Sequence, residues 1–349
     1  MRVLITGVCG FAGHSLARQL PALVPGLEIT GFDSLARAGS EINRRTNGVK
    51  LIHGDLRCAC DLESLPAVDW VIDAAAQPSV MGGVDGKSSS RQMVEHNLLG
   101  TLNMLEYCKR HRAGLILLST SRVCSIVALN ALPMHVKDSR FVPTAMVPGL
   151  SNKGVNESFS TATPISLYGS TKLASESLAL EYGAAFDFPV YVNRCGVLAG
   201  AEQFGTAEQG IFSWWIHAWR ARLPLRYIGF GAEGLQVRDA LHPNDLARLI
   251  ATQLGNNNTA KPQIVHIGGG MDRSMSLAEL SVWCAGVMGA HEVGRDENGR
   301  PFDVPWLVMD SSLATSTWDW QPEISLESTL EEIARHATNH PDWITRVNA

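Results

Sequence analysis

The sequence predicts an α/β fold in which helices cover both faces of a doubly wound parallel sheet. Short apolar runs typical of buried strands alternate with helical patterns through the first half of the chain. The first run leads directly into a glycine-rich turn. Small or polar residues also follow other runs, so the predicted strand ends are marked by Gly7, Ala75, Thr120 and Cys195. Because ligands of such sheets bind at the carboxyl ends of the strands, we expect these residues to lie near one site.

The first strand and the turn after it indicate a dinucleotide site. Residues 2–6 form an apolar, β-branched run, and the helical stretch after the turn is expected to end at Pro21. Between them, Gly7, Gly10 and Gly13 have the spacing G-x-x-G-x-x-G. Glycines let the backbone approach a pyrophosphate, and a helix N-terminus offers free N–H groups to its charge. The alternative is an ordinary glycine-rich turn.

Acidic residues follow the next two predicted strands, residues 27–32 and 49–52. Asp33 lies where a carboxylate would accept hydrogen bonds from the adenosine ribose hydroxyls, unless it is a simple exposed turn residue. This carboxylate would repel a 2′-phosphate, so NAD is expected rather than NADP, but the nearby Arg37 leaves NADP open. Asp55 could lie near the adenine, and a simple turn explains it almost as well.

Further elements continue the alternation. Apolar runs predict strands at residues 70–73, 115–118 and 189–192, and leucines and a valine at spacings of three and four predict a helix over residues 91–111. Residues 125–164 interrupt the pattern. They are rich in Pro, Ser, Asn and Gly, and loops of this length are usually functional or mobile.

Beyond Arg194 the pattern becomes irregular, which suggests a second domain. We expect residues 1–192 to form the dinucleotide-binding domain, with residues 236–262 returning to it. Residues 193–349 are expected to form mainly a smaller α/β domain that binds the substrate.

Composition narrows the class of protein. The chain has 349 residues, 45% of them hydrophobic. Its net charge is −5 and the sequence shows no cluster of basic residues, so nucleic acid is not an expected partner. No apolar run approaches the ~18–20 residues of a membrane span. The chain begins directly in a strand without a signal peptide, and its seven scattered cysteines are read as reduced thiols, so a cytoplasmic location is expected. Cys58 and Cys60 lack a second pair, so no metal site is predicted.

Tyr168 and Lys172 are the strongest candidates for chemistry. Four positions apart on a helix, they lie on the same side. A phenol with a pKa of ~10 is a poor base at neutral pH, and a nearby ammonium would lower that pKa. Alone the pattern is weak, because Tyr and Lys fall four apart on many solvated helix faces. It gains meaning when a bound dinucleotide can accept a hydride opposite the phenol.

Together these features resemble the extended short-chain dehydrogenase/reductase family, whose larger domain has the Rossmann fold. The matching segments are residues 6–13, Asp33, residues 55–56 and 74–76, Asn97, residues 119–120, Tyr168 with Lys172, residues 237–239, His242 and residues 320–322. Within the family the chain is similar to the nucleotide-sugar epimerases. Residues 33–40, 203–205, 209–210 and 236–239 are most similar to the CDP-paratose (CDP-tyvelose) 2-epimerases.

The resemblance implies a reaction. Tyr168 would be the base that removes a sugar hydroxyl proton, Lys172 would lower its pKa and bind the nicotinamide ribose, and Thr120 would align the hydroxyl. NAD would take a hydride from the same carbon and return it to the other face of the keto sugar, inverting C2 of a CDP-linked deoxyhexose. Inversion at C4, a net dehydrogenase or reductase reaction, and a non-catalytic NAD-binding regulator remain alternatives.

The resemblance also implies binding residues. Those expected to bind the cofactor are Gly7, Gly10, Phe11, Ala12, Gly13, Asp33, Ser34, Arg37, Asp55, Leu56, Ala74, Ala75, Ala76, Asn97, Tyr168, Lys172 and Cys195. Those expected to bind the nucleotide sugar are Gln77, Thr120, Gln209, Gly210 and Arg238. Arg238 could instead be a structural residue paired with Asp239 or with backbone. A homodimer is expected through the helices that contain residues 91–111 and 169–185.

Three departures from the family pattern narrow the reaction. The dehydratases carry Thr-Asp-Glu, whereas Ser121 and Arg122 follow Thr120 here, so elimination lacks its acid. Val197 stands where many 4-epimerases have Asn, and Cys124 stands where relatives usually have Tyr. We therefore expect an epimerase or a simple dehydrogenase. The effect of Cys124 is left open.

Overall fold

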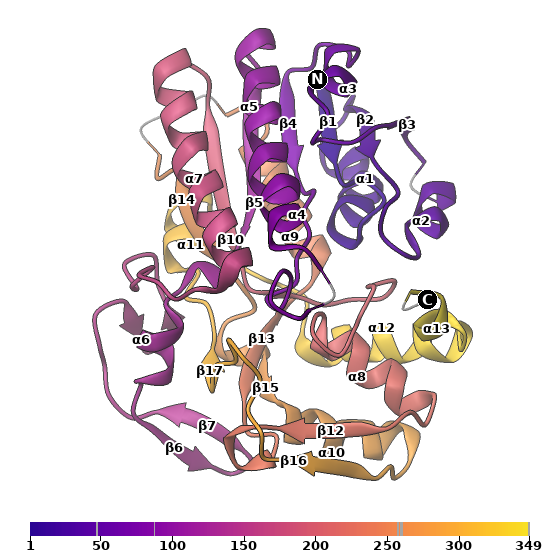
Figure 1. The fold of residues 1–349 in the computed structure, drawn as a ribbon, viewed down its shortest axis with the longest axis vertical. Helices are drawn as coiled ribbons and strands as arrows, with labels where there is room; N and C mark the ends of the chain where they lie inside the picture. The colour runs from indigo at the N-terminus through magenta and orange to yellow at the C-terminus, as the bar shows by residue number, and fades with distance from the viewer. Residues whose placement is uncertain (47, 87, 257, 259–260, 348–349) are drawn as a thin grey trace.

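The computed structural model describes residues 1–46, 48–86, 88–256, 258 and 261–347. Its larger part is built on a seven-stranded sheet with the order β14-β10-β5-β4-β1-β2-β3 (Figure 1). The strands are β1 (Arg2–Thr6), β2 (Glu28–Asp33), β3 (Lys50–His53), β4 (Trp70–Asp73), β5 (Gly114–Thr120), β10 (Val190–Cys195) and β14 (Ile264–Ile267). The neighbours all pair in parallel, which confirms the predicted doubly wound Rossmann-type fold. The strand order reverses between β1 and β4, the switch point at which such sheets bind ligands.

Helices cover both faces of this sheet (Figure 1). Helices α1 (Phe11–Leu23), α9 (Pro243–Gln253) and α11 (Ser312–Trp318) lie on one face, and α3 (Ala59–Glu63), α5 (Gly100–His111) and α7 (Ser166–Phe186) lie on the other. Side chains alternate along a strand, so Val3 and Ile5 of β1 join the first apolar core and Leu4 joins the second. This two-sided burial explains the continuous apolar runs in the sequence.

Two helices differ from their predictions. Pro21 does not end α1, which continues to Leu23 and closes with a hydrogen bond from the Val24 N–H to the Leu20 carbonyl at 2.9 Å. Pro21 stands in the last turn, so its missing N–H costs the helix a single bond. The predicted helix over residues 91–111 consists of α4 (Ser90–Val94), a π-helical turn (Glu95–Leu99) and α5. Such a turn often marks a functional position, and this one contains the buried Asn97.

The smaller part contains two further sheets. One consists of β11 (Val197–Leu198), β13 (Val237–Leu241), β15 (Ser274–Ser276) and β17 (Trp306–Leu307), and the other pairs β12 (Leu225–Ile228) with β16 (Val293–Asp296). Helices α8 (Ile211–Arg220), α10 (Leu277–Met288) and α12 (Leu326–Asn339) pack around a shared apolar core. Phe212, Trp215 and Trp219 of α8 are buried in this core.

The chain passes between the two parts more than once. Strand β13 lies in the smaller part, α9 packs on α1, and β14 is an edge strand of the large sheet. Residues 264–267 form β14 and pair with β10 in the large sheet, although the predicted division assigned them to the smaller domain. The division of the chain into two domains stays a prediction.

Residues 125–164 contain regular elements rather than one long loop. They are α6 (Ile126–Asn130), β6 (Met134–Lys137), β7 (Arg140–Pro143), β8 (Leu150–Ser151) and β9 (Gly154–Val155). Val155 and Phe159 share an apolar core with Trp306 and Val308, and the Val155 N–H donates to the Val308 carbonyl at 2.8 Å. The segment therefore packs on the second half of the chain. The remaining helices are α2 (Ser40–Thr46) and α13 (Trp343–Val347), and no described helix is long and apolar enough to span a membrane.

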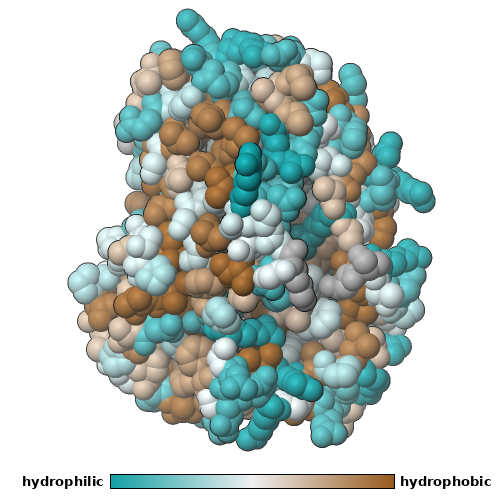
Figure 2. All heavy atoms as spheres, in the orientation of Figure 1, coloured by the Kyte–Doolittle hydropathy of each residue, from teal (hydrophilic) through white to brown (hydrophobic). Residues whose placement is uncertain are grey.

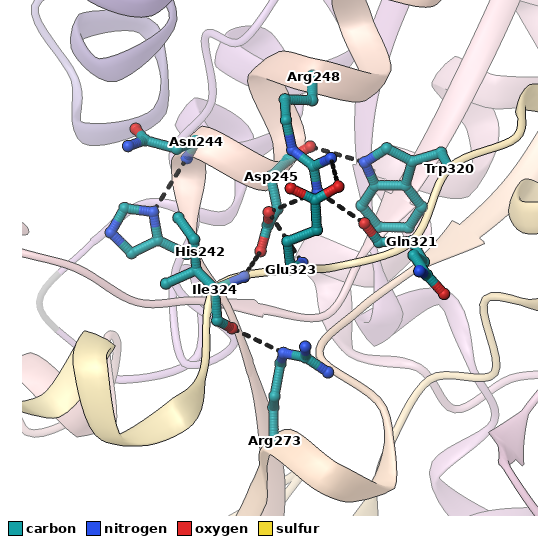
Figure 3. A network of polar contacts seen from close by, with 9 residues as sticks. All are labelled: His242, Asn244, Asp245, Arg248, Arg273, Trp320, Gln321, Glu323 and Ile324. Atoms are coloured by element: carbon teal, nitrogen blue, oxygen red, sulfur yellow. Dashed lines mark hydrogen bonds and ion pairs between the residues drawn. The ribbon is translucent and has the colours of Figure 1, made fainter.

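The start of α9 anchors the segment after α11 (Figure 3). Asp245 accepts hydrogen bonds from the Glu323 and Ile324 N–H groups, each at 3.1 Å, and the Trp320 indole donates to the Asp245 carbonyl at 2.8 Å. The His242 ring accepts from the Asn244 N–H and so caps α9. His242 and Trp320 therefore contribute to the architecture.

A buried ion pair connects α7 to β10, next to the β14 edge of the large sheet. Glu176 of α7 and Arg194 of β10 have side chains only 2% and 7% exposed, with Nη2 of Arg194 2.7 Å from Oε2 of Glu176. The Ser119 hydroxyl, at the end of β5, donates to the same carboxylate. His266 of β14 contacts Arg194 at 3.4 Å. Three strands and the long helix are thus held at one point.

We expect Glu176→Ala to lower the free energy of unfolding by about 3–5 kcal/mol, because it leaves the Arg194 charge buried without a partner. Urea denaturation of the two proteins measures the difference. Glu331→Ala removes an exposed ion pair with Arg335 and should leave stability nearly unchanged. Equal losses in the two variants would contradict the assignment of a special role to the buried pair.

Candidate active site

A pocket of about 850 Å³ opens at the carboxyl ends of the large sheet and extends into the smaller part. The sequence-predicted residues that line it are Gly7, Gly10, Phe11, Ala12, Asp33, Ser34, Arg37, Asp55, Leu56, Ala74, Ala75, Ala76, Gln77, Thr120, Tyr168, Cys195, Gln209, Gly210 and Arg238. Three predicted residues, Gly13, Asn97 and Lys172, are buried behind this wall. Tertiary structure therefore brings the predicted cofactor and substrate residues to one cavity.

The glycine turn is dictated by close backbone contacts. Gly7 has a positive φ of 62°, and a Cβ atom there would lie 2.8 Å from the Ala75 Cα. The Gly10 N–H donates to the Gly7 carbonyl at 2.9 Å, which closes the turn. A Cβ atom on Gly13 would lie 2.2 Å from the same carbonyl oxygen. The spacing G-x-x-G-x-x-G thus reflects a turn in which the start of α1 meets the end of β1.

Asp33 is held against this turn. Its carboxylate accepts hydrogen bonds from the Cys9 and Leu35 N–H groups, each at 2.8 Å. Burial raises the pKa of Asp33, while the two N–H groups favour the ionised form. The carboxylate is therefore fixed at the end of β2, directly beside the residues that could receive a pyrophosphate.

Arg37 crosses from the cofactor side of the pocket to the substrate side. Its guanidinium donates to the Phe204 carbonyl at 2.8 Å and to Gln209 Oε1 at 3.2 Å, and it lies 5.4 Å from the centre of the Phe204 ring. Phe204 in turn stacks on Trp343 of α13. Arg37 and Gln209, predicted for different ligands, thus contact each other.

Asn97 holds the pocket wall from behind. Its amide receives a hydrogen bond from the Gln77 N–H at 2.7 Å and donates to the Gln77 carbonyl at 3.1 Å and to Thr171 at 3.2 Å. Thr171 stands next to Lys172 on α7. Asn97 therefore orders the loop after β4 and the long helix together, and the structure gives it no place on the pocket surface.

Thr120 and Tyr168 lie together on the pocket wall. Burial raises the pKa of Tyr168 to about 12, and its hydrogen bond with Thr120 opposes this shift. Burial lowers the pKa of Lys172, while Asp73 and Glu176 act in the opposite direction. In the chain alone burial of the phenol outweighs nearby positive charge, and the expected lowering of the Tyr168 pKa by Lys172 stays a prediction.

Arg238 pairs with Asp303 rather than with the neighbouring Asp239. Its Nη2 lies 2.9 Å from Asp303 Oδ1 and 2.9 Å from the Val304 carbonyl oxygen, and burial lowers its pKa to about 10. Asp239 instead accepts from the Gly270 and Met309 N–H groups. Arg238 is therefore both a structural residue and part of the pocket wall.

The pocket also contains residues that the sequence argument did not assign. Arg122, Gln203, Arg300 and Asp303 line it. The sequence marks Arg122 only because it stands where the dehydratases have a carboxylate. Gln203 lies in the segment 203–205 that contributes to the family resemblance, but the sequence argument assigned it no role. Arg300 and Asp303 have no local spacing that marks them, since they come from a segment far from the predicted motifs. Among the described residues, no group of three or more His, Cys, Asp and Glu side chains could hold a metal ion.

The geometry of this pocket agrees with comparisons to known proteins. Residues 3–268 match the NAD dependent epimerase/dehydratase family, and the chain belongs to this family. NAD is accordingly its cofactor, and the resemblance to the extended short-chain dehydrogenase/reductases is confirmed.

Several relatives are similar over nearly the whole chain. The CDP-paratose 2-epimerase of Salmonella typhi is 27% identical over 344 residues, covering 95% of this chain and 98% of the relative. The UDP-glucuronate 4-epimerase of Thermodesulfobacterium geofontis (strain OPF15) is 27% identical over 358 residues, covering 99% and 98%.

Solved structures share the fold. The UDP-glucose 4-epimerase of Thermus thermophilus in complex with NAD has a TM-score of 0.75 at 25% identity, covering 97% of this chain and 99% of its own. A double mutant of DesIV, a dTDP-glucose 4,6-dehydratase of Streptomyces venezuelae, has NAD bound and a TM-score of 0.80 at 25% identity, covering 99% and 100%.

We expect Gly13→Ala to raise the NAD dissociation constant at least about tenfold, or about 1.4 kcal/mol, because the added Cβ would force the glycine turn apart. Titration calorimetry with NAD measures the change. Gly286→Ala is the matched control, since a Cβ there meets no atom within 4 Å in α10. Unchanged NAD affinity in Gly13→Ala would show that the close contact is not needed for binding.

Proposed function

We propose that this chain is an NAD-dependent nucleotide-sugar epimerase that inverts C2 of a CDP-linked deoxyhexose through a transient keto sugar. The observation that carries the proposal is the pairing of Thr120 and Tyr168 on a pocket wall that runs from the glycine turn to Arg238. Such a hydroxyl pair can hold one sugar hydroxyl and remove its proton. The similarity to a CDP-paratose 2-epimerase supports the substrate class.

The residues have distinct proposed roles. Tyr168 takes the proton of the sugar hydroxyl and later returns it, Thr120 aligns that hydroxyl, and Lys172 binds the nicotinamide ribose. Bound NAD would supply the redox chemistry by accepting a hydride from the sugar carbon and giving it back to the opposite face. General acid–base assistance of this kind contributes ~10²–10⁴-fold to the rate.

The same geometry supports NAD rather than NADP as the form that is bound. The residues of the glycine turn would hold the pyrophosphate, and Asp33, fixed by the Cys9 and Leu35 N–H groups, would face the adenosine ribose. Arg37, the residue that left NADP open, is already engaged by Phe204 and Gln209. A 2′-phosphate would meet a carboxylate without a free guanidinium to compensate it.

The carboxylates of the pocket argue against dehydration. Those among the described lining residues are Asp33, Asp55, Glu208 and Asp303. Asp55 is paired with Arg57 at 2.5 Å and Asp303 with Arg238 at 2.9 Å, and none of the four stands directly after Thr120, where the dehydratases carry Asp-Glu. Expulsion of water from a sugar needs a general acid beside the reacting carbons, so epimerisation fits this pocket better.

Three alternatives remain on the same scaffold. A UDP-glucuronate 4-epimerase is as similar in identity as the 2-epimerase, so inversion at C4 of another nucleotide sugar is the second candidate. Val197, which stands where many 4-epimerases have Asn, weighs against it. Net oxidation or reduction would be recognised by accumulation of NADH or its consumption. A non-catalytic regulator would not need to keep both Tyr168 and Lys172.

We expect the product formed from CDP-paratose or CDP-tyvelose in deuterated water to carry no deuterium at C2, because the hydride never exchanges with solvent. Mass spectrometry and NMR measure the label. Substantial deuterium at the inverted carbon would contradict the mechanism.

Tyr168→Phe should lower kcat by about 10²–10⁴-fold. Tyr182→Phe, near the C-terminal end of the same helix, should retain wild-type turnover.

We also propose that the chain forms a homodimer through α4, α5 and α7. Val94 at the end of α4, Leu99 in the π-helical turn before α5 and Phe186 at the end of α7 are 41%, 37% and 40% exposed. Figure 2 shows apolar atoms gathered over the region where Figure 1 places α5 and α7. A second copy with the same helices would cover this surface symmetrically.

We expect Leu99→Glu to shift the protein toward monomer, because a carboxylate would be buried at the centre of the proposed interface. Sedimentation velocity measures the distribution. Val282→Glu is the control, since Val282 is 72% exposed on α10, away from these helices. A wild-type protein that sediments as a monomer, or an unchanged dimer in Leu99→Glu, would overturn the proposed interface.

A further inference from the structure

One segment of the smaller part contacts the loop that carries Arg37 on the cofactor side of the pocket. This segment, which we call the strap, consists of residues 202–210 and lies between β11 and α8. We propose that Arg37 is a positioning residue that ties the strap to this loop, so that a bound nucleotide keeps NAD from leaving. The inference rests on the proposed binding roles of Asp33 and Gln209, and it adds a coupling between the two ligands.

The guanidinium of Arg37 makes the direct connection. Its Nη2 donates to the Phe204 carbonyl at 2.8 Å and to Gln209 Oε1 at 3.2 Å. This nitrogen carries two N–H groups, one for each acceptor. Because the two acceptors are well separated along the strap, one half-buried side chain holds the strap at two points.

An apolar cluster fixes the position of Phe204. Its ring stacks on Trp343 of α13 with the ring centres 5.6 Å apart, and Ile42 of α2 packs against the same cluster. A Cβ atom on Gly39 would lie 3.0 Å from the Phe204 ring, so the backbone just beyond Arg37 also contacts the strap. The Phe204 carbonyl is therefore held where the Arg37 guanidinium reaches it.

Hydrogen bonds within the strap and to the smaller part keep the strap in one shape. Thr206 and Gln209 exchange backbone hydrogen bonds at 2.8 and 3.2 Å, which closes a turn between them. The Arg300 guanidinium donates to the Ala207 carbonyl at 2.6 Å, inside this turn. A ligand that holds one side of the turn therefore also holds the side chain of Gln209, to which Arg37 is bound.

Residues from both sides of this connection line the pocket. Asp33 and Ser34 line it beside Arg37, and Gln209 and Gly210 line it from the strap. A nucleotide bound to the strap would hold Gln209 in place and, through Arg37, the loop that contains Asp33. The two ligands then stabilise the same arrangement, so each raises the affinity of the other by the same factor.

The proposed reaction gives this coupling a use. The sugar must recover the hydride that it gave up, so the cofactor has to stay in place until the keto sugar is reduced. A connection that tightens when the nucleotide is bound prevents loss of the cofactor at that stage. Once the nucleotide has left, the same connection no longer opposes exchange of NAD.

The test is the rate at which radiolabelled NAD leaves the loaded protein after dilution into unlabelled NAD, with and without saturating CDP. We expect CDP to slow release from the wild type at least about tenfold, since most differences in affinity appear in the release rate. In Arg37→Met, CDP should slow release less than about twofold. Gln209→Leu removes the same contact from the strap and should also weaken the effect of CDP. The double variant should lose no more coupling than Arg37→Met alone, because both changes remove one interaction.

Arg18→Met is the matched control. It removes a solvent-exposed ion pair between α1 and Glu202 of the same strap, at 3.0 Å, and should retain the wild-type effect of CDP. Full coupling in Arg37→Met would overturn the inference. So would wild-type coupling in Gln209→Leu, because Arg37 would then act on NAD directly rather than through the strap. If Arg37→Met does not fold, the result for Gln209→Leu decides.

UDP and dTDP in place of CDP separate this inference from the proposed function. If UDP or dTDP slows NAD release and CDP does not bind, the proposed CDP-linked substrate is wrong and the role of Arg37 stands. If CDP binds without slowing NAD release from the wild type, the role of Arg37 is wrong and the proposed substrate stands. A protein that binds none of the three nucleotides would overturn both.

Discussion

The buried pair of Glu176 and Arg194 is the constraint on which the site geometry depends. Glu176 lies one turn beyond Lys172 on α7, Arg194 precedes Cys195 at the end of β10, and the same carboxylate receives the Ser119 hydroxyl beside Thr120. An ion pair of this kind adds little net stability, because desolvation costs about as much as the attraction returns. Its value is geometric: it fixes the register of the long helix against two strand ends.

Burial then sets the chemistry of the residues that this framework positions. The phenol of Tyr168 and the ammonium of Lys172 are both buried, and each is pushed toward its neutral form. A buried phenol can act as a base only when positive charge nearby stabilises its ionised form. Lys172 interacts with Asp73 and Glu176, and Arg122 lines the pocket wall. The distribution of carboxylates therefore matters as much as the presence of a cation.

The larger half of the pocket follows from local rules, which is why the sequence predicted it. The glycine turn is set by contacts too short for a Cβ atom, Asp33 ends the adjacent strand, and the parallel sheet follows from apolar runs that are buried on both faces. Pro21 and the π-helical turn around Asn97 were missed. Each depends on where a residue falls within its helix and on what that helix packs against, which the apolar pattern does not specify.

The sequence by itself thus determined the sheet, the cofactor turn and the pair of Tyr168 and Lys172, because each of these features depends on residues that lie close together in the chain. Tertiary structure alone decided which charges meet. Arg122 contacts Phe302 across 180 positions of sequence, and Arg238 finds Asp303 across 65 rather than its own neighbour. Electrostatic interactions depend on distance in space and on burial, and neither is encoded in the spacing of a motif.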